Sequence, residues 1–160
     1  MSDLRPHFLA AGLSALALTA AAGCGSGGGA STTVAGVSSC LQSAGYGVTV
    51  VPTSQIAADG PENRGPGQTG ELLVARDRAR PAIGSDNADA VVAFWKSASL
   101  AKGSPNAKAN ALGTHADAIG SITVQPTTHL VLYAVRAAKT ASGRRAAFQA
   151  QVKKIETCVG

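Results

Sequence analysis

The sequence predicts an α+β domain over residues 34–160, with a four-stranded, mainly antiparallel sheet covered by about three helices. Two observations support this class: amphipathic helical patterns begin and end this part of the chain, and β-branched runs with short connections lie between them. The 160 residues suffice for one core, built from Ala, Val, Leu and Ile because only 4% are aromatic. A ferredoxin-like arrangement is the nearest named alternative.

The first predicted helix begins at Thr33 and ends at Gly45, a residue that suits the left-handed stop after a helix. Its apolar face follows spacings of three and four through Val37, Cys40, Leu41 and Ala44. The β-branched run at 47–52 predicts a strand that ends at Pro52.

Residues 52–70 contain three prolines and four glycines and predict a long loop. Loops of this length are either functional or disordered, and both interpretations stay open here. Residues 71–80 predict the second strand, where Arg76, Arg78 and Arg80 alternate and so share one face. Such a basic stripe can contact phosphates, although a solvated strand end is the favoured interpretation.

Residues 86–102 predict a second helix, capped by Ser85 or Asp86 and ended by the segment 103–105. Its apolar face is formed by Ala88, Val91, Val92, Trp95, Ala98 and Ser99. A further helical turn is expected within 106–113. Residues 118–125 and 129–136 predict a hairpin, and the continuous apolar run 130–135 indicates a central strand. The last helix begins near Thr140 and carries the apolar stripe Phe148, Val152, Ile155 and Val159.

An apolar run without charge occupies residues 8–22, which is short for a membrane span but typical of a signal peptide. Small residues then precede Cys24, in the order Ala21, Ala22 and Gly23. This stretch resembles bacterial lipoprotein precursors, whose signal usually ends in Leu, two small residues and Cys; here Ala21 stands at the Leu position. The resemblance implies that residues 1–23 are a signal peptide and that Cys24 receives a thioether-linked diacylglycerol.

Residues 24–33 predict a flexible tether, because glycine and serine dominate the sequence after Cys24. Ten such residues span about 18 Å root-mean-square. The expected location is the outer face of the cytoplasmic membrane, and a secreted protein with an ordinary signal peptide is the alternative. The segments "CLQSAGY" and "KKIETCV" resemble small, alanine-rich envelope proteins of high-GC Gram-positive bacteria, a likeness that covers the two ends of the domain and implies no activity.

Lipidation of Cys24 would leave Cys40 and Cys158 as an even pair in an exported domain, where disulfides persist. Each lies on or beside the apolar face of a predicted end helix. We therefore predict a disulfide that closes a loop of 118 residues (158 minus 40). Two unrelated buried thiols are the alternative.

The sequence predicts neither metal nor cofactor. His115 and Asp117 form an H-x-D pair and His129 follows, but their spacing does not indicate the three or four converging ligands that zinc requires. The G-x-S-x-G motif of hydrolases is absent, so no catalytic residue is assigned. A nucleic-acid partner is not expected either, because no aromatic residues alternate with the basic stripe.

Two classes of function follow. The first is a membrane-anchored, non-catalytic binding or accessory module of the cell envelope, whose partner is an unknown envelope protein or polymer. The alternative is a small envelope hydrolase that uses His115 or His129, which requires a histidine to meet an acid or a serine in a pocket. A weaker hypothesis is binding of acidic polymers by Arg76, Arg78, Arg80, Arg144 and Arg145, favoured by the net charge of +5.

Overall fold

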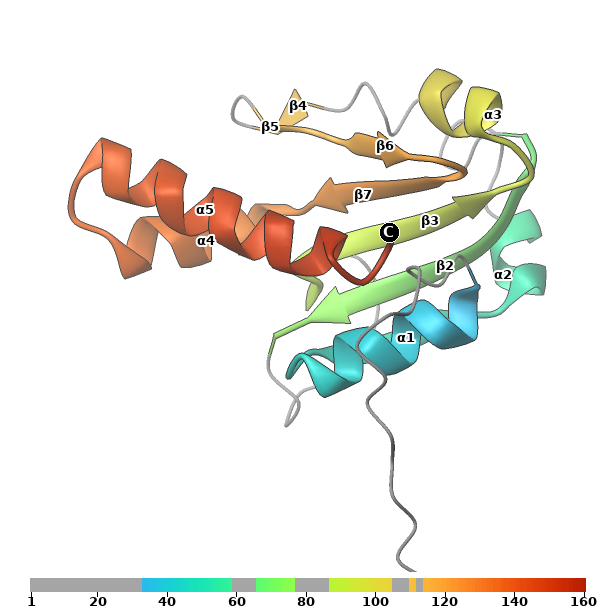
Figure 1. The fold of residues 1–160 in the computed structure, drawn as a ribbon, viewed down its shortest axis with the longest axis horizontal. Helices are drawn as coiled ribbons and strands as arrows, with labels where there is room; N and C mark the ends of the chain where they lie inside the picture. The colour runs from blue at the N-terminus through green and yellow to red at the C-terminus, as the bar shows by residue number, and fades with distance from the viewer. Residues whose placement is uncertain (1–32, 59–65, 77–86, 105–109, 112–113) are drawn as a thin grey trace, which may run out of the picture.

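The computed structural model describes residues 33–58, 66–76, 87–104, 110–111 and 114–160 (Figure 1). The predicted signal peptide, Cys24 and the tether before Thr33 lie outside these residues. The elements in chain order are α1 (Val34–Ser43), β1 (Gly47–Val51), α2 (Thr53–Ala58), β2 (Gln68–Ala75), β3 (Ala90–Trp95), α3 (Ala98–Gly103), β4 (Asn110–Ala111), β5 (Thr114–His115), β6 (Asp117–Ile119), β7 (Ile122–Pro126), α4 (Thr128–Ala137) and α5 (Ala141–Glu156).

The main sheet has five strands in the order β1-β2-β3-β7-β6, and every neighbouring pair is antiparallel. The predicted α+β class and antiparallel sheet are therefore confirmed. The counts differ from prediction, since the described residues contain five helices and five sheet strands instead of about three and four. The short strands β4 and β5 form a separate pair, and the ferredoxin-like arrangement is not confirmed.

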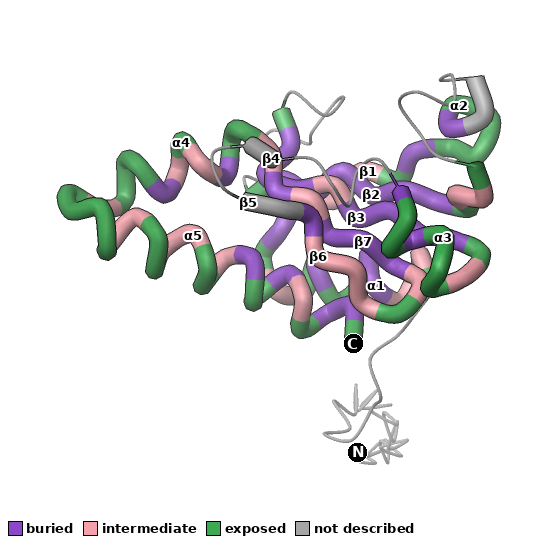
Figure 2. Tube along the Cα trace, turned by 90° about the horizontal axis from the view of Figure 1, so that it is seen from above, coloured by how far each residue is buried: buried purple, intermediate pink, exposed green. Residues whose placement is uncertain are grey.

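Helices pack on both faces of the sheet. On one face, Leu72 and Val74 of β2 pack with Leu41 of α1 and Ile155 of α5 in the largest buried cluster. Because side chains alternate along a strand, the odd-numbered residues of β2 point to the other face. There α2 contributes Ile56 to one small cluster and α3 contributes Ala101 to another. Figure 2 shows the buried strands between these helices, with α4 and α5 extending beyond the sheet.

The two predicted elements at the start of the domain are confirmed. Thr33 caps α1, because its side-chain oxygen accepts the backbone N–H of Gly36 at 3.2 Å. After the helix, Gly45 has a φ of +96°, a conformation that favours glycine. The strand β1 then follows at the predicted place.

The predicted helix over residues 86–102 is wrong. Ala90–Trp95 is instead the central strand β3, paired with β2 and β7, and only residues 98–103 are helical. Five of the six side chains of β3 are buried because helices cover both faces of the sheet. A strand buried on both faces is a continuous apolar run, and such a short run has no period that separates a strand from a helix.

The second strand of the predicted hairpin, residues 129–136, is also wrong, because it forms helix α4. The hairpin instead lies within 117–126, where β6 and β7 meet at Gly120, whose φ is +56°. In α4 the buried residues Leu130 and Ala134 lie four positions apart, which is helical spacing. The apolar run indicates a buried central strand, but Leu132 and Val135 point to solvent, with 47% and 49% of their surface exposed.

Three further segments can be compared with their predictions. The expected loop 52–70 contains α2 and the first residues of β2, while residues 59–65 lie outside the described part. Asn110–Ala111 is a strand, so the expected helical turn in 106–113 is wrong there. The last predicted helix is confirmed as α5, with Val152 and Ile155 buried and Thr140 as its cap.

Candidate functional site

A polar cluster forms where the end of β2 and the start of β3 meet α4 and α5. We call it the junction cluster, and its seven residues are Tyr46, Arg76, Asp89, His129, Tyr133, Gln151 and Lys154. They come from the end of α1, the end of β2, the start of β3 and the two C-terminal helices. Both tyrosines of the chain belong to it.

Tyr46 lies at the centre of the junction cluster and is 2% exposed. Its hydroxyl donates a hydrogen bond of 2.8 Å to Oε1 of Gln151. The Nζ atom of Lys154 lies 5.3 Å from the centroid of the Tyr46 ring, a cation–π distance. Burial raises the pKa of Tyr46, the charge of Asp89 raises it further and that of Arg76 lowers it. The hydroxyl therefore stays protonated and acts as a donor.

Arg76 follows the last residue of β2 and stacks on the second tyrosine. Its Cζ atom lies 4.1 Å from the centroid of the Tyr133 ring. A guanidinium stacked in this way keeps its N–H groups in its own plane, where they are available to other partners. The backbone N–H of Arg76 also donates to Oδ2 of Asp89 at 3.0 Å, which fixes the start of this side chain.

Asp89 is the acid of the junction cluster and is only 9% exposed. Burial raises the pKa of Asp89, whereas the backbone N–H of Arg76, then His129 and the Arg76 charge, lower it. The backbone of Asp89 is also held: its N–H donates to Val74 O at 2.7 Å, and its carbonyl accepts the N–H of Thr127 at 2.9 Å. Asp89 thus joins β2, β3 and the start of α4.

Of the two histidines proposed for a hydrolase, only His129 belongs to the junction cluster. His129 is exposed in the first turn of α4, and its charge acts on Asp89. His115 lies in β5, and its side chain is outside the described part. The junction cluster therefore contains one histidine whose charge acts on an acid, but none of its seven members is a Ser, Thr or Cys that could act as a nucleophile.

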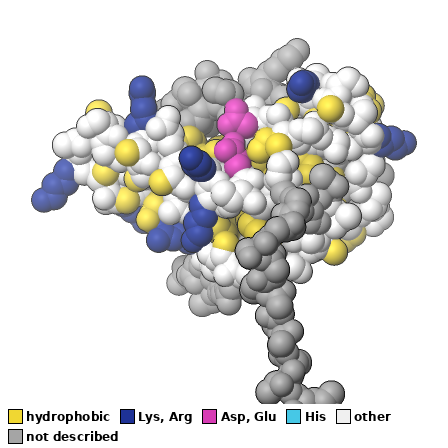
Figure 3. Space-filling view, viewed as in Figure 1, with side chains coloured by type: hydrophobic (Ala, Val, Ile, Leu, Met, Phe, Trp, Pro, Cys, Tyr) yellow, Lys and Arg dark blue, Asp and Glu magenta, His cyan; other side chains and the backbone are white. Residues whose placement is uncertain are grey.

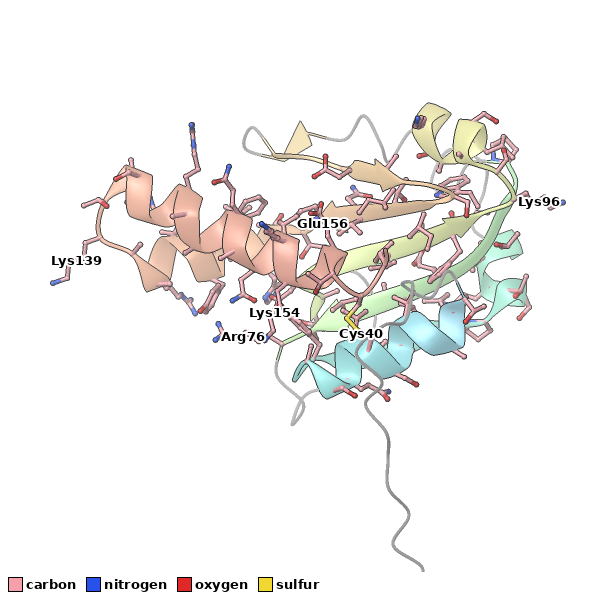
Figure 4. All side chains as sticks on the ribbon, viewed as in Figure 1. Cys40, Arg76, Lys96, Lys139, Lys154 and Glu156 are labelled. Atoms are coloured by element: carbon pink, nitrogen blue, oxygen red, sulfur yellow. A yellow bond between two sulfur atoms is a disulfide. The ribbon has the colours of Figure 1, made fainter. Side chains whose placement is uncertain are left out.

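A pair of acids, Asp117 and Glu156, lies between β6 and the end of α5. Burial raises the pKa of Glu156, a side-chain hydrogen bond with Asp117 and the charge of Asp117 raise it further, and Lys153 opposes them. Figure 3 shows acidic atoms gathered at one place on this face, and Figure 4 labels Glu156. Among the residues with described side chains, no group of three or more His, Cys, Asp and Glu could hold a metal ion.

The predicted disulfide between Cys40 and Cys158 is confirmed, with α-carbons 5.5 Å apart (Figure 4). That distance lies within the range that a disulfide requires. Cys158 is 3% exposed and packs in the largest buried cluster, whereas Cys40 is exposed on α1. The alternative of two unrelated thiols is wrong.

The predicted basic stripe is not assembled by the described residues. Arg78 and Arg80 lie outside them, and Arg76 stacks on Tyr133. Arg144 is engaged at the turn before α5, where its side chain donates to Lys139 O at 3.2 Å. Sequence analysis missed Tyr46, Asp89, Tyr133, Gln151 and Lys154, because they meet only through the packing of distant elements. The scarcity of tyrosine was the single signal that could have singled out two of them.

No helix in the described part of the chain combines the length and the apolar character needed to cross a bilayer. Comparisons with protein-family models, with curated proteins and with solved structures gave no match.

Proposed function

We propose that the chain is a membrane-anchored extracytoplasmic lipoprotein whose folded domain is a non-catalytic binding or accessory module of the cell envelope. The observation that carries the proposal is the disulfide. It uses two of the three cysteines and leaves Cys24 as the remaining one. Cys24 stands where lipoprotein precursors are acylated. Disulfides persist in oxidising compartments, so the Cys40–Cys158 bond supports export of the domain.

The proposed anchor is a diacylglycerol on Cys24. Two acyl chains hold a protein on a membrane stably, whereas a single chain binds only marginally. The Gly- and Ser-rich segment that follows would let the domain sit about 18 Å from the bilayer surface. Secretion without an anchor is the alternative, and it predicts that Cys24 is either removed with the signal or left unmodified.

The junction cluster is the proposed binding surface of the module. It joins two cationic side chains to two tyrosine rings, a combination that recognises ligands without any covalent step. The hydrolase alternative has one supporting observation, the effect of the His129 charge on Asp89, whose pKa it lowers. None of the seven residues of the junction cluster is a Ser, Thr or Cys, the usual nucleophiles of a catalytic triad.

Replacing Cys24 by serine tests the anchor. The full chain and its Cys24→Ser variant are expressed in a bacterial host that processes lipoproteins, and membrane and soluble fractions are probed for the protein. We expect the parent in the membrane fraction with incorporated acyl label, and the variant without label and released from the membrane. Ser26→Ala is the matched control and should behave as the parent. Equal acyl labelling of parent and Cys24→Ser would refute the anchor.

A further inference from the structure

We propose that Arg76 and Lys154 together bind a phosphate group, carried by a lipid headgroup or by a soluble phosphate ester. This phosphate site rests on the proposed function in one respect, namely that the domain is a binding module of the envelope. The residues that would bind the phosphate all belong to the junction cluster.

The two cations lie over the two tyrosine rings of the junction cluster. Lys154 Nζ lies 5.3 Å from the ring centroid of Tyr46, and Arg76 Cζ lies 4.1 Å from that of Tyr133. The charge of Arg76 also acts on Tyr46. Arg76 and Lys154 are both exposed, so their charged ends are open to solvent beside a buried ring. Figure 4 labels the two side chains, which both lie below α5 in that view.

Arg76 is held in place before any ligand arrives. Its guanidinium stacks on Tyr133 at 4.1 Å, and its backbone is fixed by the hydrogen bond to Asp89. A stacked guanidinium still offers its in-plane N–H groups, which match two oxygens of a phosphate, and a neighbouring ammonium can reach a third. Holding the arginine in advance lowers the entropy lost on binding.

The charge around the two cations favours an anion. Between Asp117 and Glu156 the sequence contains six basic residues and no acidic one: Arg136, Lys139, Arg144, Arg145, Lys153 and Lys154. Figure 3 shows Lys and Arg atoms along the α4–α5 hairpin and at its base. Asp89 is the acid of the junction cluster, and its carboxylate is mostly buried, where it accepts the backbone N–H of Arg76. Its carboxylate therefore lies at the backbone end of Arg76 and is mostly shielded from solvent.

The test titrates the full chain, purified in a non-ionic detergent, with inorganic phosphate and with glycerol 1-phosphate. Nuclear magnetic resonance follows the amide signals of the junction cluster. We expect saturable shifts with a dissociation constant in the millimolar range, on the order of 1 to 10 mM. Arg76→Gln and Lys154→Gln should each weaken binding at least about fivefold, because each removes one charge-assisted contact. Tyr133→Leu should weaken it as well by releasing the guanidinium, whereas Tyr133→Phe should not.

Two exposed lysines outside the junction cluster serve as matched controls. Lys96→Gln and Lys139→Gln remove the same charge from the far end of β3 and from the tip of the α4–α5 hairpin (Figure 4). Both variants should bind nearly as the parent does, because their charges are exposed and are largely screened at that separation. Loss of binding in the controls equal to that in Arg76→Gln would overturn the site, because it would indicate a general charge effect. An unchanged amide spectrum away from the junction cluster verifies that each variant is folded.

A second experiment with lipid vesicles distinguishes a lipid headgroup from a soluble phosphate ester as the source of the phosphate. The same proteins are mixed with phosphatidylglycerol vesicles and with phosphatidylcholine vesicles, and the difference in bound fraction is measured. Extra binding to phosphatidylglycerol that requires Arg76 and Lys154 supports a lipid headgroup. Binding of the soluble phosphates alone supports a soluble ester. If neither probe binds in a manner that requires both residues, the site is refuted, whereas the anchor is judged separately by acyl labelling of Cys24.

Discussion

Cys40 and Cys158 form a disulfide that joins α1 to the residues after α5, with α-carbons 5.5 Å apart across 118 residues of sequence. Both helices pack on the same face of the sheet, where Leu41 and Ile155 are fully buried. The bond therefore connects the two ends of the domain at its largest apolar cluster, to which Cys158 itself belongs.

Removing this disulfide should destabilise the domain strongly. For a loop of this size, the double replacement Cys40→Ser and Cys158→Ser should lower the free energy of unfolding by up to about 4 to 5 kcal/mol, because the unfolded chain regains conformational entropy. Urea unfolding under oxidising conditions measures the change. Ser39→Ala, at an exposed neighbour on α1, is the control and should stay within about 0.5 kcal/mol of the parent. A double variant with the parent's unfolding midpoint would contradict this role.

Gly70 should not tolerate a side chain. A β-carbon at Gly70 would lie 2.7 Å from Cγ2 of Val34, so the Val34 side chain or α1 itself would have to shift away from β2. We expect Gly70→Ala to cost about 1 to 3 kcal/mol, as overpacking typically does. Gly103→Ala is the matched control, because a β-carbon there would meet nothing within 4 Å. Thermal unfolding should separate the two variants, and equal melting temperatures would show that α1 packs differently against β2.

The Tyr46 hydroxyl should contribute to stability through its bond with Gln151. Tyr46→Phe removes this hydrogen bond of 2.8 Å and leaves the amide oxygen without that donor. The expected loss in the free energy of unfolding is about 1 kcal/mol. Tyr133→Phe serves for comparison, because the ring that stacks on Arg76 is kept, and it should have a smaller effect. A Tyr46→Phe variant as stable as the parent would argue against the bond.

Glu156 should make the domain less stable as pH rises. Burial and Asp117 raise the pKa of Glu156 in the folded state, so ionising it costs more when folded than when unfolded. Its contribution is therefore most favourable below the unfolded pKa and is lost as pH rises through the folded pKa. Glu156→Gln should raise the melting temperature by about 2 °C at about pH 7 and leave it nearly unchanged at about pH 3.

Whether Glu156→Gln raises or lowers the melting temperature depends on the interaction of Glu156 with Asp117, which a second substitution can test. Asp117→Asn should reduce the benefit of Glu156→Gln, because the two carboxyl groups act on each other. A Glu156→Gln variant that is less stable than the parent at neutral pH would contradict the assignment. It would indicate that the interaction with Lys153 outweighs burial.

The sequence predicted the ends of the domain well. In α1 and α5 one side faces the sheet and the other faces solvent, so their apolar residues recur with helical spacing and can be identified without a structure. The pairing of Cys40 with Cys158 was predicted because lipidation of Cys24 would leave them as an even pair, each on or beside the apolar face of an end helix. The strand β1 was predictable from its β-branched residues.

The middle of the chain could not be predicted in this way. The run in β3 is apolar because helices cover both faces of the sheet, and the run in α4 is apolar although Leu132 and Val135 are exposed. Two similar patterns thus correspond to a strand and to a helix. The junction cluster was missed for a related reason, since Tyr46 and Lys154 lie 108 residues apart (154 minus 46) and meet only after the sheet and helices have packed.

We propose that Cys24 carries the lipid anchor of a disulfide-bonded, exported domain. The most direct test is mass spectrometry of the N-terminal peptide of the protein isolated from membranes, without reduction. We expect Cys24 to be the first residue and to carry a diacylglycerol, and Cys40 and Cys158 to be linked in the same molecules. A first residue other than Cys24, or a Cys24 that is free of lipid, would contradict it.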